Sequence, residues 1–177
     1  MKSDKYVIQY CLDEPGDNPD AIYEIGRVMT DCRRIAVITY CKNIFKKNKQ
    51  HTCIVNDGAY SEFEIQLDDL YYPLMKNNKT LFEALVMHEI GHLVNGDLEK
   101  GESPEYAMGF REFIVRMGGM ADEKEVLADR FAVEHCGKNA VMKYLDYVIK
   151  TRRERGYDDT DIGIMELELR KNAVKKL

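Results

Sequence analysis

Hydrophobic and polar residues alternate most strictly near the middle of the chain. In the stretch HTCIVNDGAYSEFEIQLDD two β-rich runs flank the turn-forming Asn-Asp-Gly, which predicts a hairpin. In the second run Phe63, Ile65 and Leu67 alternate with acidic or amide residues, the period-two pattern of a strand with one wet face. We therefore expect an outer or half-exposed strand at Phe63–Leu67.

The residues before this hairpin are less regular. The stretch KYVIQYCL, residues 5–12, predicts a first strand, and DEPGDNP after it predicts a turn. From Asp20 onward the apolar positions recur at helical spacing, which predicts a helix. These positions are Ile22, Ile25, Val28, Met29 and Cys32. The following IAVITYCKNIF fits either more helix or a β-branched strand.

Beyond Leu70 the pattern is helical to the end. A T-x-x-E capping box, Thr80 with Glu83, predicts the start of one helix. Ser103-Pro104 predicts the start of another, which Gly118-Gly119 ends. Further helices are expected over 122–136, 139–155 and 160–175. The pattern as a whole predicts an α+β fold, mainly helical with a small, mostly antiparallel sheet, forming a single domain over 1–177.

Composition and charge narrow the class of protein. The 177 residues are 45% hydrophobic and 32% charged, which is ordinary for a globular chain. A formal net charge of -5 argues against nucleic acid as the main partner. The amino terminus has too short an apolar run for a signal peptide, and no stretch is long enough to span a membrane. We expect a cytoplasmic protein without a membrane segment.

The cysteines and the basic clusters give little indication of function. The five cysteines are odd in number and none forms a C-x-x-C pair, so reduced thiols are expected rather than a disulfide framework or thiolate zinc site. Residues 33–51 are basic, with no acid among them, which indicates a solvated face or a docking patch. The carboxyl-terminal RKNAVKKL is expected to complement a helix dipole.

The stretch EALVMHEIGHLVNGD sets ionisable groups inside an apolar run. On a helix His88 and His92 lie one turn apart, separated by roughly 40° around the axis, and Glu89 is offset from His88 by roughly 100°. A helix so apolar elsewhere should be buried on nearly all sides. The H-E-x-x-H arrangement suits zinc with two imidazole ligands and Glu89 as general base. The alternative is a pair of core histidines bonded to backbone, with Glu89 facing solvent.

A third zinc ligand is expected from a later helix. In DEKEVLADRFAVEHCG one stripe at helical spacing consists of Glu125, Ala128, Asp129, Ala132 and Cys136. Its small residues would let this helix pack closely on the first, with Glu125 as ligand and Asp129 as acceptor for a ligand imidazole. Alternatively Glu125 is the capping-box partner of Asp122. Asp97 and His135 are weaker ligand candidates.

Together these residues resemble the gluzincin zinc metallopeptidases. His88-Glu89-Ile90-Gly91-His92, followed by Glu125-x-x-Ala128-Asp129, is similar to the HExxH and ExxxD pattern of the HtpX heat-shock protease and CaaX prenyl protease group. Glu125 to Ala132 is also similar to the soluble ImmA/IrrE group. The resemblance covers residues 62–136. It implies a zincin-like domain with the sheet beside the active-site helix, and one zinc ion held by His88, His92 and Glu125.

The resemblance also implies an activity. We expect a regulatory intracellular metalloendopeptidase in which Glu89 is the general base for a zinc-activated water and the substrate is a protein or peptide. The resemblance also implies an edge strand beside the active-site helix, here Phe63–Leu67, to which an extended peptide would add by main-chain hydrogen bonds. Candidates for the donor that stabilises the oxyanion are Tyr106, Arg111, Arg116 and Tyr144. The alternative is a non-catalytic scaffold that contains zinc and binds a protein partner.

Overall fold

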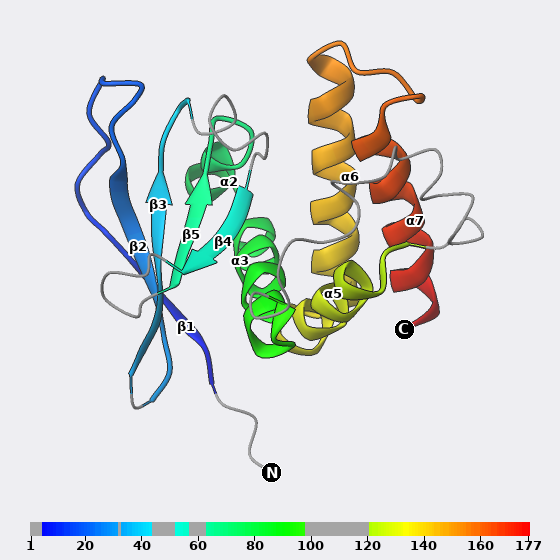
Figure 1. The fold of residues 1–177 in the computed structure, drawn as a ribbon, viewed down its shortest axis with the longest axis horizontal. Coiled ribbons are helices and arrows are strands. Elements are labelled where there is room, and N and C mark those ends of the chain that lie inside the picture. Colours follow the sequence, from blue (N-terminus) through cyan, green and yellow to red (C-terminus); the bar gives the residue numbers. More distant parts are fainter. Residues whose placement is uncertain (1–4, 32, 44–51, 57–62, 98–120) are drawn as a thin grey trace. The chain divides into compact units, whose positions relative to one another are not determined.

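The computed structural model describes residues 5–31, 33–43, 52–56, 63–97 and 121–177. The chain divides into two compact units, an amino-terminal unit over Met1–Lys79 and a carboxy-terminal unit over Thr80–Leu177. Sheet and helices are segregated along the sequence, as Figure 1 shows. The predicted α+β class is therefore confirmed, and the single-domain organisation stays a prediction.

The amino-terminal unit is built on a five-stranded sheet with the order β1-β2-β3-β5-β4. Its strands are β1 (Val7–Tyr10), β2 (Tyr23–Met29), β3 (Arg34–Tyr40), β4 (Thr52–Asn56) and β5 (Phe63–Leu67). Every pairing is antiparallel except that of β3 with β5, which is parallel. The unit ends in the short helix α2 (Tyr72–Asn77), which has a proline in its first turn. The sheet is thus mostly antiparallel, as expected.

One prediction for this unit is corrected and one open alternative is settled. The segment expected to form a helix from Asp20 is strand β2, in which Ile25 and Val28 are buried. Its sheet partners outweigh the helical spacing, because β1 and β3 pair with it along both edges. The ambiguous IAVITY is strand β3, in keeping with its β-branched residues.

The position of β5 in the sheet also differs from the prediction. β4 and β5 do pair antiparallel, as the hairpin pattern predicted, with Ile54 opposite Ile65. However, β5 lies between β3 and β4 and is not an edge strand. Both of its edges are already paired, so no peptide can add to Phe63–Leu67. Its polar face is not fully wet either, because Thr39 donates to Glu64 over 2.7 Å and Asp68 is buried.

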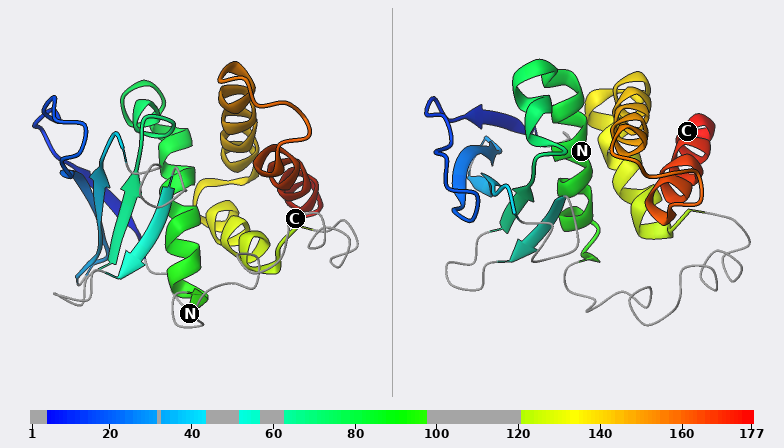
Figure 2. Two further views of the ribbon diagram at one scale, coloured as in Figure 1. Left: turned by 45° about the horizontal axis from the view of Figure 1, so that its top comes forward. Right: turned by 90° about the horizontal axis from the view of Figure 1, so that it is seen from above.

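The carboxy-terminal unit is helical in all its described elements. These are α3 (Lys79–Val94), α5 (Glu123–Cys136), α6 (Lys138–Glu154) and α7 (Ile162–Lys176). Figure 2 shows α6 and α7 side by side, and α5 contacts both of them. Their apolar faces form the core of this unit, with Tyr144, Leu145 and Ile164 almost fully buried.

The three helices predicted over 122–136, 139–155 and 160–175 begin and end within two residues of those ranges. Asp122 caps α5 by accepting from the Lys124 backbone N–H, and Asp161 caps α7 by accepting from Ile164. Thr80 is not a cap, because α3 already begins at Lys79. The predicted signals at Ser103-Pro104 and Gly118-Gly119 lie outside the described residues. None of the helices in the described ranges combines the length and the hydropathy that crossing a membrane requires.

Candidate metal site

The histidine-bearing part of α3 is buried almost all round, as its composition predicted. An unbroken buried run extends from Ala84 to Gly91 and includes His88 and Glu89. His88 is 3% exposed and Glu89 is 4% exposed. Glu89 does not face solvent, so half of the core-histidine alternative is excluded. Groups of this kind are buried only when other groups compensate their charge or hydrogen bonding.

Small residues bring α5 against α3. A Cβ atom built on Gly91 would stand 2.8 Å from the Ala128 Cα and 2.9 Å from the Ala128 carbonyl oxygen. No side chain fits at Gly91 without moving that backbone, so glycine is what permits this approach. Ala128 and Ala132 are completely buried. The predicted small-residue stripe on α5 therefore does lie against the histidine helix.

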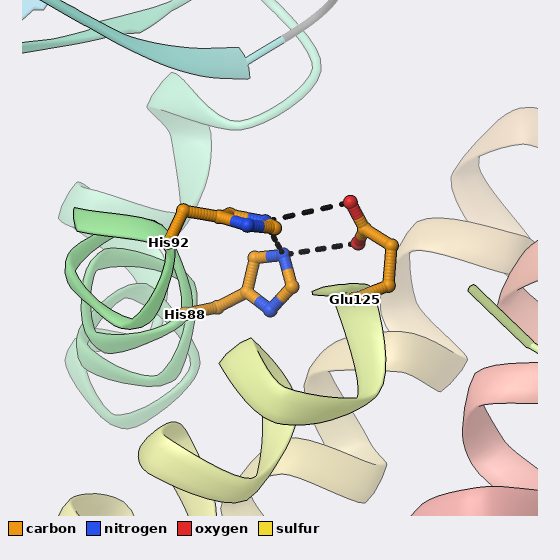
Figure 3. A group of neighbouring side chains, drawn as sticks. All are labelled: His88, His92 and Glu125. Atoms are coloured by element: carbon orange, nitrogen blue, oxygen red, sulfur yellow. Dashed lines mark hydrogen bonds and ion pairs between the residues drawn. The ribbon is translucent and has the colours of Figure 1, made fainter. Parts of the chain in front are cut away.

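This approach brings His88, His92 and Glu125 together (Figure 3). The Nε2 atoms of the two histidines are 3.2 Å apart. His88 Nε2 lies 3.2 Å from one oxygen of Glu125, Oε2, and His92 Nε2 lies 3.4 Å from the other, Oε1. Among the described residues, these three side chains form the group that could hold a metal ion.

The spacing of these atoms suits a tetrahedral ion. Zinc binds histidine nitrogen and carboxylate oxygen at about 2.0–2.2 Å, so two ligand atoms in a tetrahedral set lie about 3.4 Å apart. The observed separations of 3.2 to 3.4 Å approach that value. The two imidazoles approach different oxygens of Glu125, and with one ligand atom per residue the three atoms lie within 4.8 Å of one another, so these groups are close enough to share one ion after a small adjustment.

Each imidazole also contacts a carboxylate through Nδ1, the ring nitrogen that does not contact Glu125. His88 Nδ1 lies 2.9 Å from Asp129 Oδ1, and His92 Nδ1 lies 2.9 Å from Asp97 Oδ2. We assign the Nδ1 proton of each ring to these contacts, which leaves both Nε2 atoms pointing into the group. Carboxylates in this position orient metal-binding histidines and make them more basic. Asp129 has the position expected of it, whereas Asp97 is a support for His92 and not a ligand in the group.

The carboxylates hold protons on the imidazoles. Burial alone would lower the pKa of His88, and so would Arg170, but Asp129 and Glu125 outweigh both and raise it. Burial likewise opposes the charged form of His92, yet Glu125, Glu89 and Asp97 raise its pKa to about 9. The protein without metal therefore keeps protons where a cation would bind.

Arg170 of α7 completes the cluster and was missed in the sequence. Its guanidinium donates to both oxygens of Asp129, over 2.8 and 2.7 Å, and lies 2.9 Å from Glu125 Oε2. Burial raises the pKa of Asp129, but Arg170 and then His88 outweigh this and hold it at about 2. A signal was present, because Arg170 falls on the buried stripe of Ile164, Leu167 and Val174, where an apolar residue is expected.

Two further carboxylates lie close by. Glu89 is near enough to His92 for its charge to raise the pKa of that imidazole. Glu166, one turn before Arg170 on α7, is half-buried. Its burial and the charge of Glu125 raise the pKa of Glu166 to about 7. No motif or spacing in the sequence singles out Glu166.

The remaining predicted residues are also placed. Glu125 turns its carboxylate to the histidines and Arg170, which favours the ligand interpretation over the capping box. His135 bonds to the Phe131 carbonyl oxygen instead, over 2.8 Å. Tyr144 is 1% exposed and influences Arg170 electrostatically. The other oxyanion-donor candidates, Tyr106, Arg111 and Arg116, lie outside the described residues.

Comparisons with protein-family models, with curated proteins and with solved structures found no significant match. The function is therefore inferred from the chemistry of this site.

Proposed function

We propose that the protein is a zinc metallopeptidase of the gluzincin type, with His88, His92 and Glu125 as zinc ligands. The observation that carries the proposal is the convergence of two imidazole nitrogens and a carboxylate at separations of 3.2 to 3.4 Å. Neutral imidazole and carboxylate are ligands that zinc accepts, and histidine with glutamate is a set found in catalytic zinc sites.

When bound there, zinc supplies a water acidic enough to attack near neutral pH and polarises a peptide carbonyl. Glu89 is the residue of this chain that takes the proton of the attacking water and passes it to the leaving amine. Its position on α3 beside His88 and its electrostatic influence on His92 support this role. Asp129 and Asp97 keep the Nδ1 protons and so keep both Nε2 atoms available.

Glu89 also argues for catalysis over a purely structural site. Structural zinc sites close with four protein ligands, whereas catalytic sites use three and leave a position open. The described residues offer three. A buried carboxylate beside such a set, outside the ligand group, would be costly in a scaffold that uses the ion only for stability.

The test combines zinc content with cleavage of a library of internally quenched peptides. We expect wild type and Glu89→Gln to carry about one zinc per chain, and Glu125→Gln to lose most of it. Glu89→Gln should lower the rate of cleavage by about 10²- to 10⁴-fold, because it removes the general base. Glu134→Gln, an exposed change on the same helix as Glu125, is the matched control and should alter neither quantity.

Three results would contradict the proposal, each in a different part. A wild-type protein that binds no zinc would exclude the metal site. Zinc bound by wild type, with peptide cleavage that Glu89→Gln leaves unchanged, would exclude the assigned mechanism. Zinc bound without cleavage of any peptide in the library would favour the non-catalytic scaffold.

A further inference from the structure

Arg170 is a buried cation placed beside a site proposed to bind another cation. It is 6% exposed and comes from α7, the last helix of the chain. A positive charge so near a metal site opposes metal binding by simple repulsion. Its charge therefore does not explain why an arginine lies beside a metal site.

The geometry of its contacts supplies the reason. Two nitrogens of the guanidinium, Nε and Nη2, hold both oxygens of Asp129, and the third, Nη1, holds Oε2 of Glu125. A planar fork with donors in fixed directions can make these three contacts at once, whereas the ammonium of a lysine is a point charge. Arg170 thus joins the supporting carboxylate of His88 to the carboxylate of the third ligand.

We infer that Arg170 is a positioning residue that holds the carboxylate of Glu125 at the two histidines and fixes Asp129 against His88. Oε2, the oxygen that the guanidinium contacts, lies 3.2 Å from His88 Nε2, and Oε1 lies 3.4 Å from His92 Nε2. This inference rests on the proposed function, because it assigns Arg170 a part in the same metal site.

A positioning role and a mere counter-charge role predict opposite effects on zinc affinity. If Arg170 positions the carboxylates, both Arg170→Lys and Arg170→Met should weaken zinc binding by about 10- to 100-fold, as loss of supporting contacts does. If it only neutralises charge, Arg170→Lys should bind zinc as wild type does. Arg170→Met should then bind more tightly, because a repelling charge is gone.

The experiment is a competition between each protein and a chromophoric zinc chelator, at one pH and one salt concentration. Lys176→Met, an exposed basic residue in the last turn of α7, is the matched control and should bind zinc as wild type does. The absorption spectrum of the Co²⁺-substituted protein provides a second readout. Displacement of the Glu125 carboxylate in Arg170→Lys should change that spectrum, because the spectrum depends on the number and arrangement of the ligands around Co²⁺.

The outcomes separate this inference from the proposed function. A wild type without zinc affinity overturns both. A wild type that binds zinc, with Arg170→Lys unchanged in both affinity and Co²⁺ spectrum, overturns the positioning role alone. Should Arg170→Met fail to fold, Arg170→Lys decides by itself, because it retains the buried charge.

Discussion

One ion pair from each unit shows two opposite environments for charged side chains. In the amino-terminal unit Glu14 pairs with Lys76 at the surface, where their side chains are 73% and 43% exposed. In the carboxy-terminal unit Asp129 pairs with Arg170 where the side chains are 1% and 8% exposed. Exposed ion pairs contribute little to the free energy of folding, because water screens them. Buried charges must be compensated by opposite charges and hydrogen bonds. Burial of the charges therefore indicates function more strongly than ion pairing does.

The largest effect is expected from removing one partner of the buried pair. Asp129→Asn should lower the free energy of unfolding of the metal-free protein by about 3 to 5 kcal/mol, because Arg170 is left buried without its main counter-charge. Chemical denaturation in the presence of a chelator measures this. A loss below about 1 kcal/mol would place this pair with the exposed ones.

The stability of the same unit should depend on pH. The pKa of His92 is raised from 6.5 to about 9 in the folded, metal-free protein. A raised pKa stabilises the folded state fully below 6.5, and this stabilisation is lost as the pH rises through about 9. We expect the contribution of His92 to the free energy of unfolding to decrease by about 3 kcal/mol over that pH window.

Denaturation of the chelated protein at several pH values between 6 and 9.5 checks this, with His92→Gln as the comparison. The variant should show a clearly smaller decrease than wild type. Identical pH profiles for the two proteins would contradict the predicted contribution of His92.

Zinc binding near pH 7.5 should also release protons, detectable by calorimetry in buffers of different ionisation enthalpy.

A smaller effect is expected from two glycines that both lack room for a side chain. A Cβ on Gly91 would stand 2.8 Å from the Ala128 Cα, and one on Gly26 would stand 2.8 Å from the Gln9 carbonyl oxygen. Each substitution to alanine should destabilise the protein by about 1 to 3 kcal/mol through overpacking. Only Gly91→Ala should also weaken zinc binding, because only it separates α3 from α5. Equal zinc affinity in the two variants would contradict this.

The smallest effect is expected at the surface of the amino-terminal unit. A double-mutant cycle with Glu14→Gln and Lys76→Met should give a coupling energy of about 0 to 1 kcal/mol. The corresponding cycle with Asp129→Asn and Arg170→Met should give a larger one. If the two coupling energies are equal, burial does not distinguish the two pairs.

Much of the site was predictable because it follows local spacing. His88, Glu89 and His92 share one helix, so their relative directions depend only on helical geometry. The small residues of the α5 stripe predicted its close approach, which Gly91 and Ala128 bear out. The errors in the amino-terminal unit have another origin. β2 has helical spacing but pairs with strands on both sides, and a period within one segment cannot reveal its partners.

The sequence by itself determined the α+β class, the histidine helix and the expectation that Glu125 and Asp129 would lie near the imidazoles. Only the tertiary structure decided that β5 is an interior strand, that Asp97 supports His92 and that Arg170 joins Asp129 to Glu125. The physical reason is the range of the interactions. Side-chain directions within one helix are set by its own backbone, whereas a guanidinium 41 residues from its carboxylate finds it only when packing buries both.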